Sequence, residues 1–217
     1  MSPKRINRQI RFFYDRLGKN ICFFTAVICY NPDFLYRKAN SSKGMFTLDL
    51  KQYIRGIPDF SKPGILFRDI TPLLSDPGAF SQAIKEMSSP YIDKRIQYVA
   101  AVEARGFMFG SAIAYVLNAG FIPLRKKGKL PHQTMAAAYG LEYGQDSIEV
   151  HTDAIRPGDK VLLVDDLLAT GGTMAAACEL LEKLEAQISG LSFLIELTDL
   201  HGRRRIQSYP LHVVLSY

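Results

Sequence analysis

Residues 161–173 read VLLVDDLLATGGT, and this stretch decides the fold. Val161–Val164 is a run of four apolar residues, which is typical of a parallel strand covered on both faces. Two acidic residues and a Thr-Gly-Gly-Thr turn follow it. Beyond the turn, apolar residues recur at steps of three and four, which predicts a helix over Thr173–Glu185. A strand, a glycine-rich turn and a helix in this order indicate a parallel sheet that binds its ligand at the carboxyl ends of its strands.

The turn itself has the chemistry of a phosphate site. Its two glycines permit φ > 0 and close approach, so successive backbone N–H groups can point toward one place. Threonine hydroxyls and the positive end of the helix dipole add to the attraction for a phosphate monoester. No lysine follows the glycines and no G-x-G-x-x-G is present, so the turn is neither a Walker A loop nor a dinucleotide fingerprint. The predicted phosphate-binding residues are Ala169, Thr170, Gly171, Gly172 and Thr173.

Two carboxylates precede this turn. Asp165 and Asp166 close the predicted strand, and carboxylates accept hydrogen bonds without donating them. We therefore expect them to bind two vicinal hydroxyls, as on a ribose ring.

The remaining elements complete an α/β pattern. Asp76 and Pro77 predict the N-cap and first position of a helix that runs to about Met87. Alternation of strands and helices predicts right-handed crossovers and a doubly wound, mostly parallel sheet, with residues 103–106 on the same rim as the turn. The other expected elements are helices over Leu48–Ile57 and Gly106–Leu117, strands over Tyr98–Val102, Phe121–Leu124, Ile188–Leu197 and His212–Leu215, and a two-stranded flap over residues 130–152.

Charge is distributed unevenly along the 217 residues. The formal net charge is +6, but residues 1–44 hold nine Lys or Arg against two acids, and residues 45–217 hold 18 against 19. The main body is therefore close to neutral, and its charge gives no reason to propose a nucleic-acid partner.

Residues 1–44 are expected to be a poorly ordered basic extension, with Met45 opening the functional chain. The apolar run Ile21–Tyr30 has ten residues, whereas a membrane-spanning helix needs about 20. A basic stretch followed by a short apolar run also resembles a secretory signal, but no small-x-small cleavage site follows it. The segment is too poor in serine to favour an organelle-targeting peptide.

Cysteine and histidine usage narrows the chemistry. Cys22, Cys29 and Cys178 have no paired spacing, which indicates a reducing compartment and predicts a cytoplasmic protein. The four histidines are scattered without metal-ligand spacing, so the sequence predicts no protein-held metal.

The stretch 161–173 resembles the phosphoribosyl-diphosphate (PRPP) binding motif of the type I phosphoribosyltransferases. Further segments resemble the adenine-specific branch of that family and follow in the expected order. They are PDFSKPGILFRDITPLL (58–74), EARGFMFG (103–110), RKKGKLP (125–131), YGLEYGQDSIEVHTDAI (139–155) and LIELTDLHGR (194–203). The resemblance covers residues 45–217 and does not reach residues 1–44.

The resemblance implies a reaction and an architecture. Adenine and PRPP would give AMP and diphosphate in purine salvage, with Mg²⁺ carried by the diphosphate. The fold would be a doubly wound, mostly parallel α/β sheet with a flexible lid over about residues 126–152. The lid would exclude water from the reacting centre. A homodimer is also implied, since basic residues of the family can reach a neighbouring subunit's site.

The resemblance also assigns roles to residues. The phosphate would bind at residues 169–173 and the ribose hydroxyls at Asp165 and Asp166. Glu142 would be the catalytic acid/base that exchanges a proton with the purine, with Tyr143 beside it in the lid. The diphosphate would contact Arg105, Arg125, Lys126 and Lys129. Adenine would meet backbone groups of Leu66–Arg68, with the Arg68 side chain secondary, and the apolar faces of Ala169 and Leu197. The peptide between Glu103 and Ala104 would be cis.

Two alternatives remain open at this point. Transfer to another purine base, such as guanine or xanthine, would use the same PRPP site. A PRPP-sensing regulator would keep the phosphate turn but perform no chemistry. Such regulators carry a DNA-binding domain ahead of the PRPP domain, and 44 residues with a central apolar run are short for one. The presence of Glu142 and of the flap favours catalysis.

Overall fold

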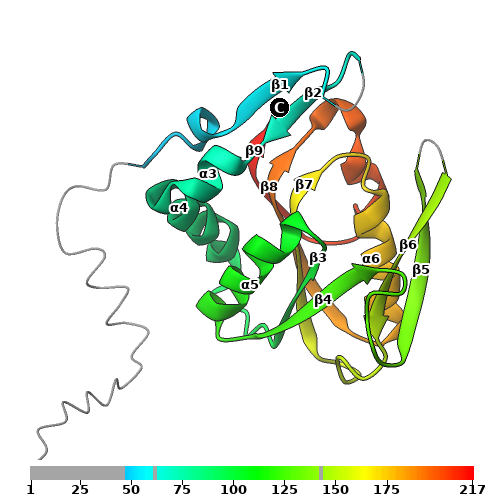
Figure 1. Cartoon of the computed structure of the whole chain (residues 1–217). Coiled ribbons are helices and arrows are strands. Elements are labelled where there is room, and N and C mark those ends of the chain that lie inside the picture. Colours follow the sequence, from blue (N-terminus) through cyan, green and yellow to red (C-terminus); the bar gives the residue numbers. More distant parts are fainter. Residues whose placement is uncertain (1–46, 61–62, 142–143) are drawn as a thin grey trace, which may run out of the picture. The chain divides into compact units, whose positions relative to one another are not determined.

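The computed structural model describes residues 47–60, 63–141 and 144–217 (Figure 1). The expectations for residues 1–44, and those for Glu142 and Tyr143, lie outside the described residues.

A seven-stranded sheet forms the centre of the described part (Figure 1). Its strands lie in the order β5-β6-β4-β3-β7-β8-β9. The neighbours from β4 to β9 run parallel, whereas β6 is antiparallel to β4, and β5 to β6. The strands are β3 (Tyr98–Val102), β4 (Gly120–Lys126), β5 (Thr134–Leu141), β6 (Gly144–His151), β7 (Lys160–Leu168), β8 (Gln187–Glu196) and β9 (Leu211–Ser216).

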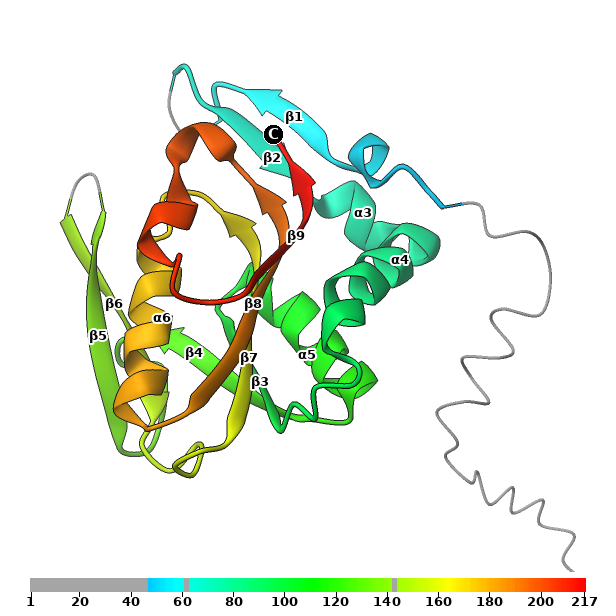
Figure 2. The same ribbon diagram turned by 180° about the vertical axis from the view of Figure 1, so that it is seen from behind.

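Helices cover both faces of this sheet, as Figures 1 and 2 show. The helices are α3 (Thr71–Ser75), α4 (Pro77–Ser88), α5 (Arg105–Leu117) and α6 (Gly172–Lys183), and short 3₁₀ turns are η2 (Leu50–Tyr53), η3 (Ser89–Tyr91), η4 (Thr198–Leu200) and η5 (Gly202–Arg205). Strand residues alternate between two cores: Val99 and Leu162 pack with α4 and α5, whereas Ala100 and Leu163 pack with α6. The predicted doubly wound, mostly parallel α/β sheet is confirmed.

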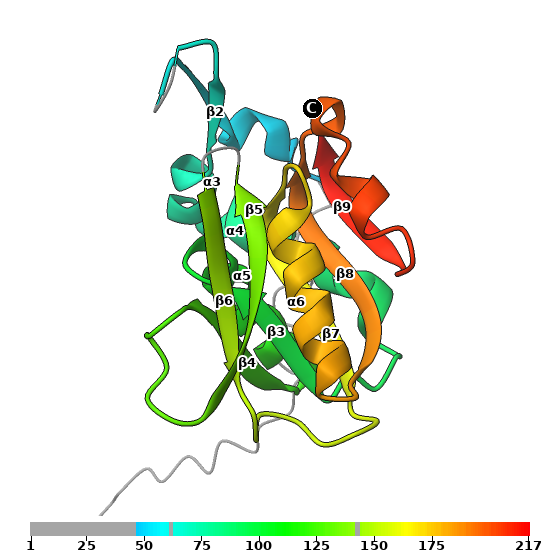
Figure 3. The ribbon, with the colours of Figure 1, turned by 90° about the vertical axis from the view of Figure 1, so that its right-hand side faces the viewer.

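A local signal explains where α4 begins. The Asp76 carboxylate accepts a hydrogen bond from the Ala79 N–H at 2.8 Å, so α4 begins at Pro77 as predicted. The flap is confirmed as the hairpin β5–β6, which stands beside α6 (Figure 3). Strand β7 runs on to Leu168, so both aspartates lie within the strand rather than after it.

The helix expected over Leu48–Ile57 is wrong. Asp49 caps a turn of only four residues, η2. Arg55–Pro58 then forms β1, which pairs antiparallel with β2 (Leu66–Asp69). Gly56 and Pro58 disfavour helix, and the Gly56–Arg68 register completes a hairpin. In Figures 1 and 2 this hairpin lies over the carboxyl ends of β8 and β9.

Candidate active site

The segment between β7 and α6, residues 169–171, is held by close contact between backbones. Gly171 has φ +78°, in the left-handed region that favours glycine. A Cβ on Gly171 would lie 2.5 Å from the carbonyl oxygen of Gly202, and a Cβ on Gly202 would collide with the carbonyl oxygen of Ala169. Both positions therefore require glycine. The N–H groups at the start of α6 are left at the rim, where an anion can approach them.

A half-buried ion pair, Arg203–Glu196, holds the chain next to Gly202. Arg203 makes two bonds to Glu196, with Nε–Oε1 at 2.6 Å and Nη2–Oε2 at 2.7 Å. Glu196 is 3% exposed and lies beside Leu168 in the β7–β8 register. Bidentate pairing of this kind restrains orientation as well as position. Sequence reasoning did not single out Gly202, Arg203 or Glu196, although all three lie in the quoted segment 194–203.

The two predicted ribose-binding carboxylates are neighbours in the carboxyl-terminal half of β7. The Asp166 N–H donates to Asp165 Oδ1 at 2.9 Å, and Asp166 is 4% exposed. Gly106 at the start of α5 approaches so closely that a Cβ there would lie 2.7 Å from Asp165 Oδ1. Helix α5 and strand β7 therefore meet at this carboxylate.

Arg105 pairs with the second carboxylate but leaves it short of donors. Arg105 Nε lies 2.9 Å from Asp166 Oδ2 as an ion pair. This contact does not have the geometry of a hydrogen bond. Among the described residues, no group donates a hydrogen bond to the buried Oδ2 of Asp166. Burial raises the pKa of both aspartates, and the Asp166 charge raises the pKa of Asp165 further, whereas Arg105 opposes the rise at Asp166. A hydroxyl donor or a positive charge placed here would relieve both effects.

The predicted adenine-binding residues lie next to this pair. The Arg105 guanidinium lies 5.4 Å from the ring centre of Phe67 in β2. The Arg68 guanidinium stacks on the Tyr217 ring at 3.9 Å. Leu66 is 47% exposed, and the Leu197 N–H donates to the carbonyl oxygen of Leu168 at 2.9 Å. The structure thus brings Leu66–Arg68 to Arg105, and Leu197 to the end of β7.

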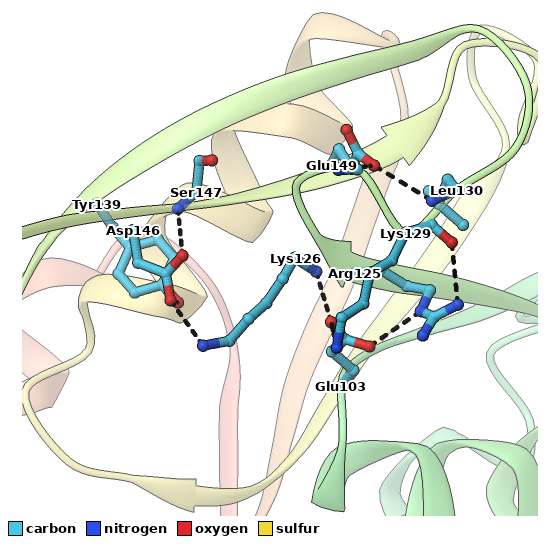
Figure 4. A network of polar contacts seen from close by, with 10 residues as sticks. Glu103, Arg125, Lys126, Lys129, Leu130, Tyr139, Asp146, Ser147 and Glu149 are labelled. Carbon is cyan, nitrogen blue, oxygen red and sulfur yellow. Dashed lines mark hydrogen bonds and ion pairs between the residues drawn. The ribbon is translucent and has the colours of Figure 1, made fainter.

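Three of the four predicted diphosphate-binding residues, Arg125, Lys126 and Lys129, gather around Glu103 (Figure 4), whereas Arg105 pairs with Asp166. Glu103 accepts from Arg125 Nε at 2.9 Å and from the Lys126 N–H at 2.8 Å, and Lys129 Nζ lies 3.3 Å away. Burial acts to raise the pKa of Glu103, but the hydrogen bonds from these three residues outweigh it and lower the pKa. The Glu103–Ala104 peptide is cis, as the resemblance implied. Glu103 therefore anchors the basic cluster at the rim.

Other carboxylates order the residues around this cluster. Glu149, on β6 and 4% exposed, accepts from the N–H groups of Gly128 and Leu130 at 3.0 and 3.3 Å, and from Thr134 Oγ1 at 3.1 Å. Lys126 Nζ lies 2.9 Å from Asp146 Oδ2, also on β6. We call residues 125–130 the cation loop. Sequence reasoning missed Glu103, Asp146 and Glu149; the only available signal was an acid within a strand or at its end.

No described helix is long and apolar enough to cross a bilayer. Within the same residues, no group of three or more His, Cys, Asp or Glu side chains is placed to hold a metal ion.

Comparison with known proteins gives a consistent result. The phosphoribosyl transferase domain family matches residues 74–215. An adenine phosphoribosyltransferase of Rhodopirellula baltica is 54% identical over 179 residues, covering 82% of this chain and 87% of the relative.

Solved structures agree with the sequence relatives. Adenine phosphoribosyltransferase from Rhodothermus marinus is 51% identical with a TM-score of 0.74, covering 77% of this chain and 96% of that one. The Saccharomyces cerevisiae enzyme, solved with adenine and an imino-altritol bisphosphate, is 39% identical with a TM-score of 0.73. It covers 76% of this chain and 96% of its own.

Proposed function

The chain belongs to the adenine phosphoribosyltransferase family and transfers the 5-phosphoribosyl group of PRPP to adenine, and we propose that the rim described above carries out this transfer. The products are AMP and diphosphate, and the role is purine salvage. The single observation that carries the assignment of residues is the carboxylate pair Asp165–Asp166. It lies in the carboxyl-terminal half of β7, two residues before the phosphate segment, and one of its buried oxygens lacks a donor among the described residues.

The substrate would lie along the rim from the phosphate segment to the cation loop. The 5′-phosphate accepts hydrogen bonds from the N–H groups of residues 169–173 and from the hydroxyls of Thr170 and Thr173. The two ribose hydroxyls donate to the carboxylates of Asp165 and Asp166. This arrangement fixes the ring so that its anomeric carbon faces the hairpin β1–β2.

Charges of opposite sign then develop on the ribose and on the leaving diphosphate. The bond from the anomeric carbon to the diphosphate oxygen breaks, leaving positive charge on the ribose and negative charge on the leaving group. Asp165 and Asp166 stabilise the first, and Arg105, Arg125, Lys126 and Lys129 the second. Adenine N9 forms the new bond, and the proton lost by the purine passes to Glu142. Glu142 and its neighbour Tyr143 follow Leu141 in the sequence and are outside the described residues.

Base recognition would rest on the hairpin. Backbone donors and acceptors of Leu66–Arg68 read the amino-purine edge, while Leu197 and Ala169 cover the faces of the ring. A 6-oxo purine reverses the pattern of donor and acceptor, which leaves backbone groups unpaired. Phe67 contacts Arg105, so the base site is joined to the diphosphate site.

Mg²⁺ would enter with PRPP, bound to its diphosphate. This ion prefers oxygen ligands and keeps several bound waters, and the carboxylate oxygens of Asp165 and Asp166 can accept hydrogen bonds from those waters. When bound, Mg²⁺ neutralises part of the charge that the diphosphate gains as it leaves.

A homodimer is supported by an exposed apolar face. Met108 and Tyr115 lie two turns apart on α5, and Val116 and Phe121 extend the face; their exposed fractions are 37%, 61%, 50% and 36%. Replacing Val116 with Lys should convert a dimer to a monomer in sedimentation velocity. An unchanged sedimentation coefficient would place the interface elsewhere.

We infer a cytoplasmic location for this enzyme. Cys178 is buried and unpaired, which suits a reducing compartment.

Initial rates with PRPP and each of four bases test the specificity. We expect kcat/KM for adenine to exceed that for hypoxanthine, guanine or xanthine by about 100-fold or more, because the oxo bases leave backbone groups unpaired. Comparable rates with an oxo purine would reject the base assignment. Binding of duplex DNA without AMP formation would instead favour a regulator.

A further inference from the structure

One cation of the loop has a partner of a different kind from the others. Arg125 and Lys129 both contact Glu103, which lies on the rim between β3 and α5. The Lys126 ammonium instead contacts Asp146 of the lid strand β6 at 2.9 Å (Figure 4). The Lys126 N–H nevertheless donates to Glu103, so its main chain is anchored with the rest of the loop. Among the loop cations whose ion pairs the structure describes, Lys126 is the one that pairs with a carboxylate of β6.

Asp146 does not depend on Lys126 for its hydrogen bonds. The Ser147 N–H donates to Oδ1 at 2.9 Å, and the Tyr139 hydroxyl donates to Oδ2 at 3.2 Å. Tyr139 stands directly opposite Asp146 in the β5–β6 register. If the Lys126 ammonium moved away, the Asp146 carboxylate would therefore keep two hydrogen-bond donors. Neither of its oxygens would be left without a partner.

Lys126 is suited to change partners. Its side chain is 55% exposed and that of Asp146 is 25% exposed, and ion pairs with this much solvent access are weak. An ammonium on a flexible four-carbon stem can turn without moving the backbone. A diphosphate group carries more negative charge than one carboxylate and attracts the same ammonium more strongly. Glu103, at 7% exposed, gives Arg125 no comparable freedom.

We propose that Asp146 is a positioning residue of the transfer reaction, whose carboxylate holds the Lys126 ammonium in the ligand-free enzyme and yields it to the diphosphate of PRPP. The inference rests on the proposed function, because it takes Lys126 as a diphosphate ligand. Asp146 then competes with the bound anion for Lys126. The competition weakens the binding of PRPP and favours departure of the diphosphate product.

Calorimetric titration of the full chain with magnesium diphosphate tests this role. Asp146→Asn removes the competing charge at nearly constant shape, so we expect the Kd for diphosphate and the KM for PRPP to fall about threefold. The KM for adenine should not change. Asp146→Glu keeps the charge and should restore values near those of the wild type. Glu179→Gln, which breaks the exposed Glu179–Lys183 pair on α6, is the control for loss of one charge.

Lys126→Met separates failure of this inference from failure of the proposed function. If Lys126→Met leaves the Kd for diphosphate unchanged, Lys126 is not a diphosphate ligand. If Lys126→Met weakens binding while Asp146→Asn leaves it unchanged or weakens it, Asp146 does not compete for the ammonium. The inference predicts that Asp146→Asn has no effect in the Lys126→Met background, since no ammonium remains to be released.

Discussion

The phosphate segment at residues 169–173 and the cation loop at residues 125–130 share one rim and are built in opposite ways. The first is shaped by backbone contact: Gly171 and Gly202 touch, and neither can carry a Cβ without a collision. The second is shaped by side chains. Glu103 accepts hydrogen bonds from the Arg125 side chain and the Lys126 N–H, and Glu149 accepts from the N–H groups of Gly128 and Leu130. Its glycine, Gly128, has φ +81° and open space around the position of a Cβ within the described structure.

The difference separates two ways of fixing an anion site. A backbone site is rigid and admits almost no substitution, because every atom is part of the packing. A site made of paired side chains tolerates change gradually, since each carboxylate–cation pair contributes separately and can be exchanged for a ligand. A phosphate that stays bound through the reaction suits the first, and a diphosphate that must leave suits the second.

The largest effect is expected at the backbone contact. Gly171→Ala should lower kcat/KM for PRPP by about 100-fold or more and destabilise the fold by about 2–4 kcal/mol, because the Cβ meets Gly202 and the φ of +78° is strained. Steady-state AMP formation and thermal unfolding measure the two effects. Gly158→Ala is the matched control, since Gly158 has φ +85° but no described atom lies within 4 Å of its Cβ position. Equal losses in the two variants would mean that strain alone, and not the contact, shapes the segment.

A second large effect is expected at the carboxylates, with opposite signs for activity and stability. Asp165→Asn should lower kcat by about 100-fold, because it removes charge that stabilises the ribosyl cation. The pKa of Asp165 is raised in the fold by burial and by Asp166, so the folded state resists its ionisation. The wild type therefore loses stability as the pH rises through this pKa, and the amide does not.

Thermal unfolding measured from pH 4 to pH 9 tests the sign of the stability difference between Asp165→Asn and the wild type. Asp165→Asn should be more stable than the wild type at high pH, and the gain should shrink as the pH falls. Asp93→Asn changes one exposed carboxylate and serves as control. A variant that is less stable than the wild type at pH 8 would contradict the reasoning.

The cation loop should respond more mildly. Glu103→Gln should raise the KM for PRPP about tenfold, because Arg125 and Lys129 lose the carboxylate that orients them. The pKa of Glu103 is lowered in the fold, so its stabilisation is present above the ordinary pKa of glutamate and is lost as the pH falls through the lowered value. Unfolding curves should show a deficit for the variant at neutral pH that closes in acid.

Glu179→Gln again controls for removal of one carboxylate, at an exposed pair on α6. An unchanged KM for PRPP in Glu103→Gln would show that the cations keep their positions without the anchor.

The same contrast explains what could be predicted from the sequence. The phosphate segment is encoded locally, since the strand, the aspartates, the glycines and the helix follow one another within residues 161–185. The partners of the cation loop are not local: Glu103 lies 22 residues before Arg125, and Glu149 lies 21 residues after Gly128. No periodicity or spacing marks such pairs, so the resemblance supplied the cations but not their anchors.

Three further outcomes have physical reasons. Gly202 was missed because the need for glycine there comes from Ala169 and Gly171, which meet it only in the fold. The helix expected over Leu48–Ile57 was wrong because the capped turn η2 ends at Tyr53 and Gly56 disfavours helix. Pairing with β2 then fixed residues 55–58 as a strand. The aspartate pair was predicted from the sequence, but only the structure shows that the buried Oδ2 of Asp166 has no hydrogen-bond donor among the described residues.

The smallest effect on activity is expected at Phe67, which lies between the predicted adenine site and Arg105. The Phe67 ring lies 5.4 Å from the Arg105 guanidinium, and a cation–π contact of this kind contributes about 0.5–1 kcal/mol at an accessible site. Phe67→Leu keeps an apolar side chain but removes the ring, so kcat/KM should fall about threefold. Phe60→Leu is the control, because Phe60 packs on Phe67 at 4.8 Å and is 51% exposed. A loss confined to Phe67→Leu indicates that this ring positions Arg105, whereas equal losses would indicate that the two rings only pack the hairpin together.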